Sequence, residues 1–285
     1  MTMVRDYIHL CKPKVVLLMI LTSLVGMCLA PSETVPWMTM LLGNIGIGMV
    51  AGAAAALNHL ADQHIDKEMR RTQHRPLVKG KISSRNCIIF STVLGMSGLV
   101  LLIYLVNPLT ALLTFFSLIG YAGIYTLYLK YATPQNIVIG GIAGAAPPLL
   151  GWTAVTNAIS HEALLLVLII FVWTPPHFWA LAIHRLEDYK KVQVPMLPIT
   201  HGVKFTKINI LLYTILLTCV SLLPYLINMS GKIYLTGTVI ADLIFLHHAI
   251  KLFDNKNTAQ AIKTFYYSIY YLGIIFILLL IDHYF

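Results

Sequence analysis

The chain has 285 residues, of which 58% are hydrophobic and only 11% charged, and its formal net charge is +9. A water-soluble domain usually carries about 25% charged residues, so this composition excludes an ordinary soluble fold. Apolar runs of about 20 residues, long enough to cross a bilayer as a helix, recur along the whole chain. Because the alternating segments typical of a membrane barrel are absent, the sequence predicts an all-α polytopic membrane protein.

About nine spans follow one another without a long linker, so we expect a single domain over residues 1–285. The first span is short, and we interpret it as extending back through Cys11–Pro13. Two longer loops, 58–86 and 184–206, follow the second and sixth spans, which favours a duplicated four-helix unit with one extra helix. The predicted spans are 15–30, 37–57, 87–106, 109–129, 136–155, 162–183, 207–228, 232–251 and 264–284.

The Lys and Arg residues lie on one side of this layout. When the connections are assigned to alternating sides, every one of these cations except Lys232 falls on the side of the N-terminus. The positive-inside rule therefore places the N-terminus in the cytoplasm and, with nine spans, the C-terminus outside. We expect a bacterial cytoplasmic (inner) membrane. A basic face of this kind attracts anionic lipid or an anionic substrate, and it requires no nucleic acid.

Asn58, Asp62 and Asp66 stand four residues apart where the second span ends, in the stretch NHLADQHID. We call these three residues the oxygen row. If the helix continues to about Met69, their side chains line one face, because each step of four residues turns an α-helix by about 40° and advances it by about 6 Å. Like charges at this spacing repel, and Mg²⁺ with phosphate oxygens relieves that repulsion. The spacing alone leaves open an ordinary charged loop.

Basic residues follow the oxygen row closely and suit the remaining charge of a diphosphate. Arg binds phosphate oxygens bidentately, whereas Lys acts as a point charge. These cations also serve membrane topology. The predicted diphosphate clamps, among which Arg75 is foremost, are Arg70, Arg71, Arg75 and Lys79.

Three stretches of the chain resemble a known family. The sequence NHLADQHIDKEMRRTQHRPL resembles the first signature of the UbiA-type intramembrane prenyltransferases, which move an isoprenoid chain from its diphosphate onto an acceptor. The stretches TPQNIVIGGIAGAAPPLLGW (133–152) and WTPPHFWALAIHRLEDYKKVQVPMLP (173–198) resemble the branch that farnesylates protohaem IX. The resemblance covers nearly the whole chain, and it implies a helix bundle around a central cavity.

The resemblance also implies a reaction and its participants. Farnesyl diphosphate and haem b are the implied substrates, Mg²⁺ is the implied cofactor, and haem O is the product after water adds. Lys130 and Tyr125 are implied to face the diphosphate. Partners in haem A synthesis or terminal oxidase assembly follow from the same resemblance. Aromatic residues near the cytoplasmic ends either stabilise a carbocation or anchor the interface, and these are Tyr121, Tyr125, Tyr128, Phe178 and Trp179.

The second loop departs from the broader family pattern, because it has no second pair of aspartates four residues apart. Glu187 and Asp188 are adjacent, and adjacent residues on a helix point about 100° apart. We expect Asp188 to hold a second Mg²⁺ and Glu187 to support it. Lys190 and Lys191 are candidates for binding diphosphate or the haem propionates.

His177 is the foremost candidate for a haem-iron ligand, and Arg185 for pairing a propionate. His184 shares its helix face by spacing, and a packing histidine is the competing interpretation for either. Pro175 and Pro176 are expected to break or bend the sixth helix. Asp242 is an acid within the eighth span, which marks it as a functional candidate without an identifiable partner.

Two other classes of function remain open. A family member with a quinone-type aromatic acceptor is one, and the stretches 133–152 and 173–198 argue against it. A haem or lipid transporter without catalysis is the other. A transporter should carry ionisable residues and broken helices near the membrane midplane, whereas the charges here gather at one face.

Overall fold

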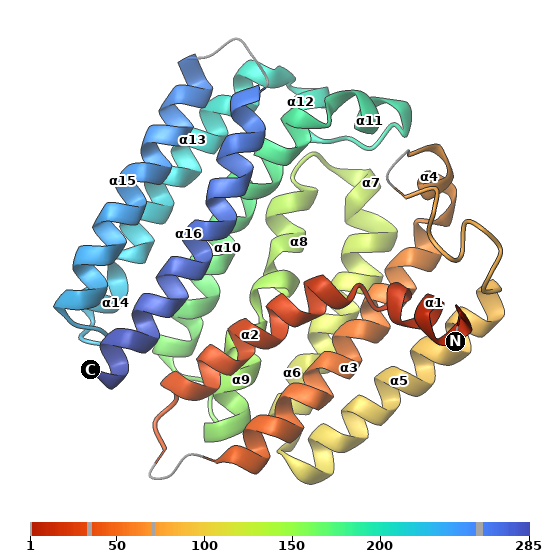
Figure 1. Cartoon of the computed structure of the whole chain (residues 1–285), viewed down its shortest axis with the longest axis horizontal. Helices are drawn as coiled ribbons and strands as arrows, with labels where there is room; N and C mark the ends of the chain where they lie inside the picture. The colour runs from red at the N-terminus through yellow and green to blue at the C-terminus, as the bar shows by residue number, and fades with distance from the viewer. Residues whose placement is uncertain (1, 33–35, 70–71, 255–258) are drawn as a thin grey trace. The chain divides into compact units, whose positions relative to one another are not determined.

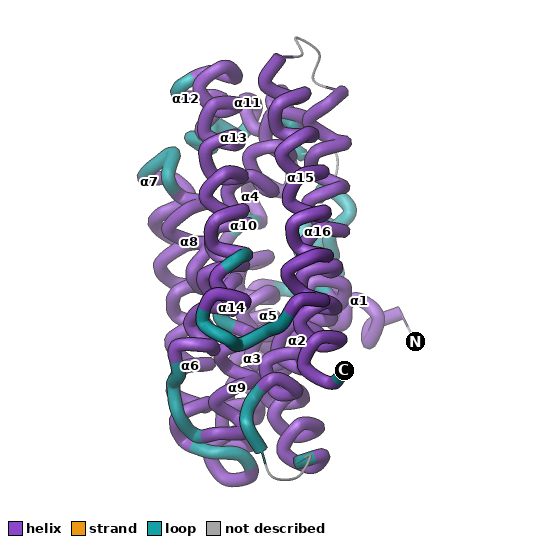
Figure 2. The backbone as a smooth tube through the Cα atoms, turned by 90° about the vertical axis from the view of Figure 1, so that its left-hand side faces the viewer, coloured by secondary structure: helices purple, strands orange, loops and turns teal. Residues whose placement is uncertain are grey.

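The structure, a computed structural model, describes residues 2–32, 36–69, 72–254 and 259–285. In these ranges it contains helices and loops but no strand (Figure 2), which confirms the predicted all-α fold. Eight of the described helices are long and apolar enough to cross a membrane, or nine if a bent pair near the N-terminus counts as one span. These helices overlap every predicted span.

The chain divides into two compact units, which are described separately (Figure 1). The first unit holds residues 1–130 and 146–159, and the second holds 131–145 and 160–285. The helices of the first unit are α1 (Thr2–Leu10), α2 (Pro13–Leu29), α3 (Trp37–Ala61), α4 (Gln63–Glu68), α5 (Ser84–Leu105), α6 (Pro108–Leu118), the π-helix η1 (Ile119–Leu129) and α9 (Pro147–Thr156). A short helix, α7 (Lys130–Ala132), lies at the boundary.

The helices of the second unit are α8 (Asn136–Ala145), α10 (His161–His184), α11 (Leu186–Lys191), α12 (Leu197–Thr200), α13 (Gly202–Ser221), α14 (Leu223–Leu226), α15 (Lys232–Asp254) and α16 (Ala259–Tyr284). Side chains of the residues preceding several long helices cap them in both units. Asn107 Oδ1 accepts from the Thr110 N–H at 2.8 Å and caps α6, which begins at Pro108. Ser160 Oγ accepts from the Ala163 N–H at 3.3 Å and caps α10. Ordinary polar caps therefore set where these apolar helices begin.

Close backbone approach holds the first unit together, as the small residues in its helices suggest. Helix α3 packs along α5, and α2 packs along α9. A Cβ added at Gly151 of α9 would lie 1.9 Å from the Ser23 carbonyl oxygen of α2, and one at Gly98 would lie 2.9 Å from the Gly46 carbonyl oxygen. Such contacts are typical of membrane helices, where van der Waals packing rather than apolar burial drives association.

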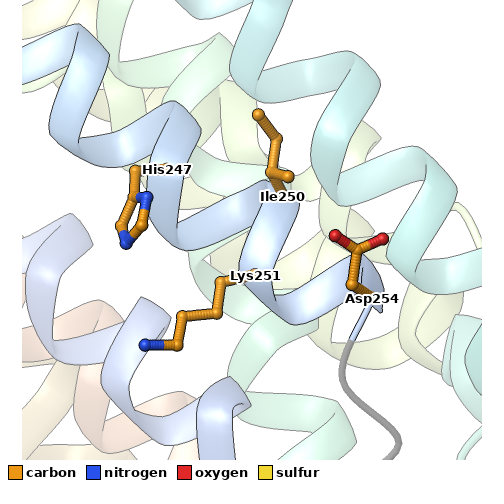
Figure 3. Close-up of a pocket in the computed structure, with 4 residues that line it drawn as sticks. All are labelled: His247, Ile250, Lys251 and Asp254. Atoms are coloured by element: carbon orange, nitrogen blue, oxygen red, sulfur yellow. The ribbon is translucent and has the colours of Figure 1, made fainter.

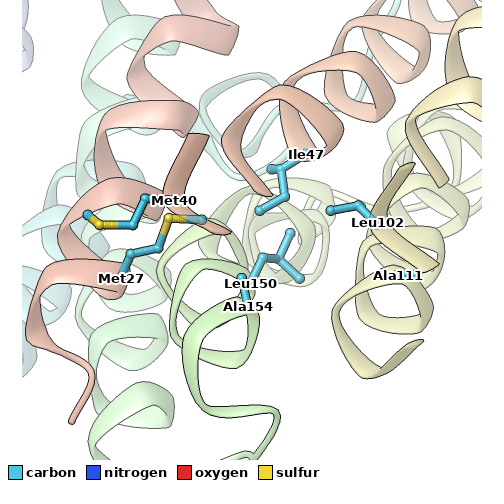
Figure 4. Close-up of a cluster of buried hydrophobic side chains, with 7 residues drawn as sticks. All are labelled: Met27, Met40, Ile47, Leu102, Ala111, Leu150 and Ala154. Carbon is cyan, nitrogen blue, oxygen red and sulfur yellow. The ribbon is translucent and has the colours of Figure 1, made fainter. Parts of the chain in front are cut away.

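An apolar cluster fills the first unit between α2, α3, α5, α6 and α9 (Figure 4). Each of its side chains is at most 6% exposed. The cluster consists of Met27, Met40, Ile47, Leu102, Ala111, Leu150 and Ala154. A second cluster, with Leu10, Ala56 and Leu77 among its members, fixes α1 and the loop after α4 against α3 and α5. The loop that follows α4 is thus anchored to α3 and α5 through Leu77.

In the second unit α10 is the central helix, and α8, α13 and α16 pack against it. Helix α10 runs without interruption through Pro175 and Pro176, so of the predicted break or bend the break does not occur. Both prolines are buried among the neighbouring helices. Surrounding helices allow a membrane helix to keep a proline that would end an isolated one. Gly141 of α8 brings that helix close to Thr174 of α10, since an added Cβ would lie 3.1 Å from the Thr174 methyl carbon.

Candidate functional site

The oxygen row lies at the end of α3 and in α4, within the first unit. The single helix predicted to reach Met69 is wrong in detail, because α3 ends at Ala61 and α4 begins at Gln63. The four-residue spacing survives the break, since the Asp62 N–H donates to the Asn58 carbonyl at 3.0 Å and the Asp66 N–H donates to the Asp62 carbonyl at 2.9 Å.

All three side chains of the oxygen row are buried. Asn58 is 4% exposed, Asp62 7% and Asp66 4%. A buried carboxylate is costly unless it is paired and hydrogen-bonded. This burial argues against the alternative of an ordinary solvated loop.

Each member of the oxygen row is paired with one cation. The Lys12 Nζ donates to Asn58 Oδ1 at 2.5 Å, and the Lys130 Nζ donates to Asp62 Oδ1 at 2.6 Å. The Arg75 Nη1 donates to Asp66 Oδ2 at 2.5 Å. The bases therefore come from three separate segments: the residue before α2, the start of α7 directly after η1, and the loop after α4. Charge-assisted hydrogen bonds of this length are among the stronger ones in proteins.

Lys12 was not among the predicted site residues. The first span extends back through Cys11–Pro13 only as a bent pair of helices: α1 and α2 meet at 52°, and Lys12 between them has a left-handed backbone with φ of 49°. Strained backbone of this kind persists only where its surroundings hold it. Burial, and after it the charge of Arg75, lowers the pKa of Lys12 to about 7, against the opposing effects of Asp62 and Asp66.

The loop after α4 is tied to the oxygen row through its backbone. Thr72 Oγ1 donates to the Asp66 carbonyl at 3.1 Å, and Gln63 Nε2 donates to the Leu77 carbonyl at 3.2 Å. Of the predicted clamps, the structure brings Arg75 to the row. Lys79 is exposed, and no hydrogen bond or ion pair joins it to the row among the described residues. Arg70 and Arg71 lie outside the described residues.

The π-helix η1 presents an aromatic pair beside these charges. The Tyr121 and Tyr125 rings stack with their centroids 5.9 Å apart and their planes 12° from parallel. The Tyr121 hydroxyl lies 3.5 Å from the Lys12 Nζ. Tyr121 therefore contacts one of the cations, and the predicted Tyr125 is stacked on Tyr121. A π-helix of this kind is rare, and such segments are frequent at functional sites.

The second predicted half-site belongs to the second unit and is more solvated. Glu187 and Lys190 form an ion pair at 2.8 Å, and their side chains are 77% and 50% exposed. Asp188 is half-buried on the short helix α11, and Lys191 is exposed. Exposed pairs of this type contribute little stability. No cluster of three His, Cys, Asp or Glu side chains suited to a metal occurs among the described residues, so an ion at either place would depend on amide or substrate oxygens as well.

His177 lies in an aromatic stack within the second unit. Its ring lies 4.2 Å from that of Trp173 and 4.5 Å from that of Phe265, and its Nδ1 lies 2.7 Å from Ser268 Oγ. Ser268 Oγ donates its single proton to the Phe265 carbonyl at 2.6 Å, so it accepts from His177. This arrangement assigns the proton of the neutral ring to Nδ1 and leaves the lone pair on Nε2.

The two residues grouped with His177 have different surroundings. Arg185 caps the end of α10 and is half-buried. His184 is exposed, so it does not share the environment of His177 despite the seven-residue spacing. Of the other aromatic candidates, Tyr128 is 68% exposed, whereas Trp179 is buried against Tyr213.

Asp242, for which the sequence offered no partner, is hydrogen-bonded in the core of the second unit. Its two carboxylate oxygens accept from Ser221 Oγ at 2.8 Å and from the Tyr271 hydroxyl at 2.7 Å. The Tyr234 hydroxyl donates to the Ser221 carbonyl at 2.6 Å and extends this network. The acid therefore joins α13, α15 and α16, which is a packing role.

A surface hollow on α15 is lined by none of the residues that we predicted for the site (Figure 3). His247, Ile250, Lys251 and Asp254 line it, all of them on one helix of the second unit. Its lining has neither the paired carboxylates nor the aromatic residues of the places described above. The oxygen row is the candidate site because its buried carboxylates are paired with cations, not because it lines a hollow.

Comparison with known proteins agrees with this description. The sequence profile described as "UbiA prenyltransferase family" matches residues 19–278, and the chain belongs to that family. It is therefore a prenyltransferase, an enzyme that moves an isoprenoid group. The predicted family membership is confirmed.

Among curated relatives, the "Protoheme IX farnesyltransferase" of Stutzerimonas stutzeri is 59% identical over 280 residues, which cover 98% of this chain and 94% of the relative. That of Legionella pneumophila (strain Lens) is 58% identical over 281 residues, covering 99% and 96%. The solved structure of a digeranylgeranylglyceryl phosphate synthase has the same fold, with a TM-score of 0.84, 22% identity and 99% of both chains covered. A UbiA homolog from Archaeoglobus fulgidus, solved with GPP and Mg²⁺, has a TM-score of 0.70, 14% identity, and 96% and 99% coverage.

Proposed function

We propose that this enzyme transfers the farnesyl group of farnesyl diphosphate to a vinyl group of haem b, with addition of water, giving haem O and diphosphate. The observation that carries the proposal is the oxygen row with its three paired cations, buried in a chain whose relatives bear the name protoheme IX farnesyltransferase. Binding an uncharged acceptor would not require three buried cations beside two carboxylates. A leaving diphosphate requires cations and a metal to stabilise its negative charge.

The donor set of the oxygen row fits Mg²⁺. It offers one amide oxygen and two carboxylates, and Mg²⁺ typically takes one or two carboxylates and completes its shell with water and phosphate oxygens. When bound there, Mg²⁺ would supply charge neutralisation for the leaving diphosphate. The A. fulgidus homolog was solved with that ion and a prenyl diphosphate, which supports the assignment by family.

The cations of the site act on the same leaving group. Lys12, Lys130 and Arg75 are already fixed beside the row, so they pay little reorganisation when negative charge develops on the diphosphate. We assign Arg70, Arg71 and Lys79 to the outer part of the same clamp. The ring faces of Tyr121 and Tyr125 would stabilise the positive charge that develops on the farnesyl carbon.

The bond changes balance with one water molecule. The C1–O bond of farnesyl diphosphate breaks, and its electron pair leaves with the diphosphate. The vinyl π electrons then form a carbon–carbon bond to C1, which leaves the positive charge on the carbon next to the porphyrin. Water adds to that carbon and loses one proton, giving a hydroxyethylfarnesyl group. An apolar chamber is needed until the last step, because water would otherwise capture the farnesyl cation.

We assign acceptor binding to the second unit. His177 with its Nε2 lone pair is the proposed haem-iron ligand, and Arg185, Lys190 and Lys191 are the proposed partners of the propionates. Glu187 and Asp188 remain proposed supports for a second Mg²⁺. His177→Ala should shift the Soret band of the bound haem. An unchanged spectrum together with unchanged turnover would remove the ligand role while leaving the transfer reaction intact.

The proposed location is the cytoplasmic membrane of a bacterium, with the oxygen row at its cytoplasmic face and the C-terminus outside. The one-sided distribution of Lys and Arg supports this orientation. We further propose haem A synthase or the terminal oxidase assembly as the consumer of haem O. Cysteine labelling of variants with single cysteines at each end would test the orientation.

The decisive experiment uses the purified protein with haem b, farnesyl diphosphate and Mg²⁺. Diphosphate release and a haem product heavier by one farnesyl group and one hydroxyl group are the expected results. Asp62→Ala should abolish both, whereas Asp254→Asn, at an exposed position on α15, should leave both intact. Prenylation of an aromatic quinone precursor in place of haem would overturn the acceptor. Normal activity of Asp62→Ala would overturn the site.

A further inference from the structure

A chain of hydrogen bonds runs from Lys12 through the oxygen row into the π-helix. Asn58 Oδ1 accepts from the Lys12 Nζ at 2.5 Å, and Asn58 Nδ2 donates to Thr126 Oγ1 at 3.1 Å. Thr126 Oγ1 in turn donates to the Tyr121 carbonyl at 2.7 Å. Asn58 is 4% exposed and Thr126 0%. Buried hydrogen bonds of this kind are stronger than the same bonds in water, because the local dielectric constant is low.

The donors available in this hydrogen-bond chain determine which way the Asn58 amide is oriented. A side-chain amide has a donor end and an acceptor end of nearly the same shape, so only its partners decide which end faces which way. A threonine hydroxyl has one proton, and Thr126 uses it on the Tyr121 carbonyl. Toward Asn58 it can therefore only accept, which places the NH₂ group there. The carbonyl end then faces the Lys12 Nζ, which donates to it, so both ends of the hydrogen-bond chain agree.

The π-helix is what makes this connection possible. In an α-helix, residues five apart are separated by about 140° around the axis, so Tyr121 and Thr126 would lie on different faces. The wider i→i+5 turn of η1 aligns residues five apart. The Thr126 hydroxyl can therefore reach the Tyr121 carbonyl while it faces α3, which packs against η1 in the first unit.

We propose that Thr126 is a positioning residue: it holds Asn58 in the single orientation that presents Oδ1 as a ligand oxygen for the metal of the diphosphate site. Oδ1 has a second lone pair besides the one that Lys12 uses. Without the Thr126 acceptor, the Nδ2 end of the amide loses its partner, and only the Lys12 contact still opposes the orientation that offers the NH₂ group to a cation. The proposal rests on the proposed role of Asn58 in metal binding, and it adds a residue that does not touch the metal.

The test compares three variants that differ in the hydroxyl. Thr126→Val keeps the side-chain shape and removes the hydroxyl, whereas Thr126→Ser keeps the hydroxyl. Thr114→Val is the matched control, since Thr114 is 3% exposed and its hydroxyl donates only to the Thr110 carbonyl within the preceding helix. The readout is Mn²⁺ binding to the purified protein, followed by electron paramagnetic resonance, and it requires neither substrate. The Mg²⁺ concentration for half-maximal diphosphate release is measured alongside.

Loss of a residue that orients a metal ligand typically weakens metal affinity by about 10- to 100-fold. We expect Thr126→Val to raise the Mn²⁺ dissociation constant by about tenfold or more, and Thr126→Ser and Thr114→Val to stay within about twofold of the wild type. In an Asn58→Ala background, Thr126→Val should cause no further loss. If the valine variant does not fold, Thr126→Ala takes its place.

Two results would overturn the proposal: wild-type Mn²⁺ affinity in a folded Thr126→Val protein, or full additivity with Asn58→Ala. Additivity would show that Thr126 acts through some other group. The outcome is independent of the acceptor. If the enzyme prenylates a molecule other than haem, the proposed function fails in the product assay, while the Mn²⁺ titration still decides the role of Thr126.

Discussion

The pair formed by Asp62 and Lys130 allows a quantitative prediction. The Lys130 Nζ lies 2.6 Å from Asp62 Oδ1, and the side chains are 15% and 9% exposed. Removing one partner of a buried ion pair typically costs about 3 to 5 kcal/mol, because the other charge remains buried without compensation. Since Lys130 retains some exposure, we take the lower end, about 3 kcal/mol, for Lys130→Met.

A loss of that size should be visible as a shift in melting temperature. At about 2 to 4 °C per kcal/mol for a chain of this size class, Lys130→Met should melt about 6 to 12 °C below the wild type. Asp62→Asn should melt higher than Lys130→Met, because a free ammonium on a flexible stem reaches water more easily than a carboxylate. The double variant should regain about 2 kcal/mol relative to the sum of the two single changes.

Thermal unfolding followed by size-exclusion chromatography in detergent measures all four proteins of this cycle. Lys263→Met, at an exposed position on α16, is the control and should melt with the wild type. Diphosphate release should fall by about 100-fold or more in both single variants and should not recover in the double variant, because catalysis needs the charges themselves. A Lys130→Met protein that melts with the wild type, or a coupling energy near zero, would refute the reasoning.

Three further predictions concern packing, metal and the core acid. Gly151→Ala should lower stability by about 1 to 3 kcal/mol, because the new Cβ would lie 1.9 Å from the Ser23 carbonyl oxygen. Gly144→Ala is the control, since its Cβ would have no atom within 4 Å. The same melting temperature for both variants would contradict this packing. Chelation with EDTA should stop diphosphate release, and added Mg²⁺ should restore it; release that continues would exclude a metal requirement. Asp242→Ala should lower stability by about 2 kcal/mol, because the buried Tyr271 hydroxyl loses its carboxylate acceptor, whereas Ser221 can still donate to the Thr218 carbonyl. The Mg²⁺ requirement should not change, and an altered requirement would place Asp242 in the site.

The sequence by itself was sufficient for the membrane spans, because the length of an apolar run is set by bilayer thickness and needs no tertiary information. It also grouped Asn58, Asp62 and Asp66 and named Arg75, from the basic run after the row, and Lys130, from the family resemblance. The structure pairs these two cations with the row, whereas their role in binding stays a prediction. The three residues keep their helical four-residue spacing even though the predicted continuous helix is broken at Asp62. That spacing depends on two local backbone hydrogen bonds, which the break at Asp62 leaves intact.

Only the tertiary structure decided which groups meet across helices. Lys12 reaches Asn58 because the chain bends sharply at a left-handed residue, and no periodicity of side chains encodes that bend. Thr126 faces Asn58 because η1 is wound as a π-helix, whereas hydropathy has the same pattern for an α-helix there. The partners of Asp242, Ser221 and Tyr271, likewise lie on two other helices, α13 and α16. Hydrophobic patterning reports burial along one segment, but hydrogen bonds between segments depend on how the backbones pack, and that is determined only in the folded chain.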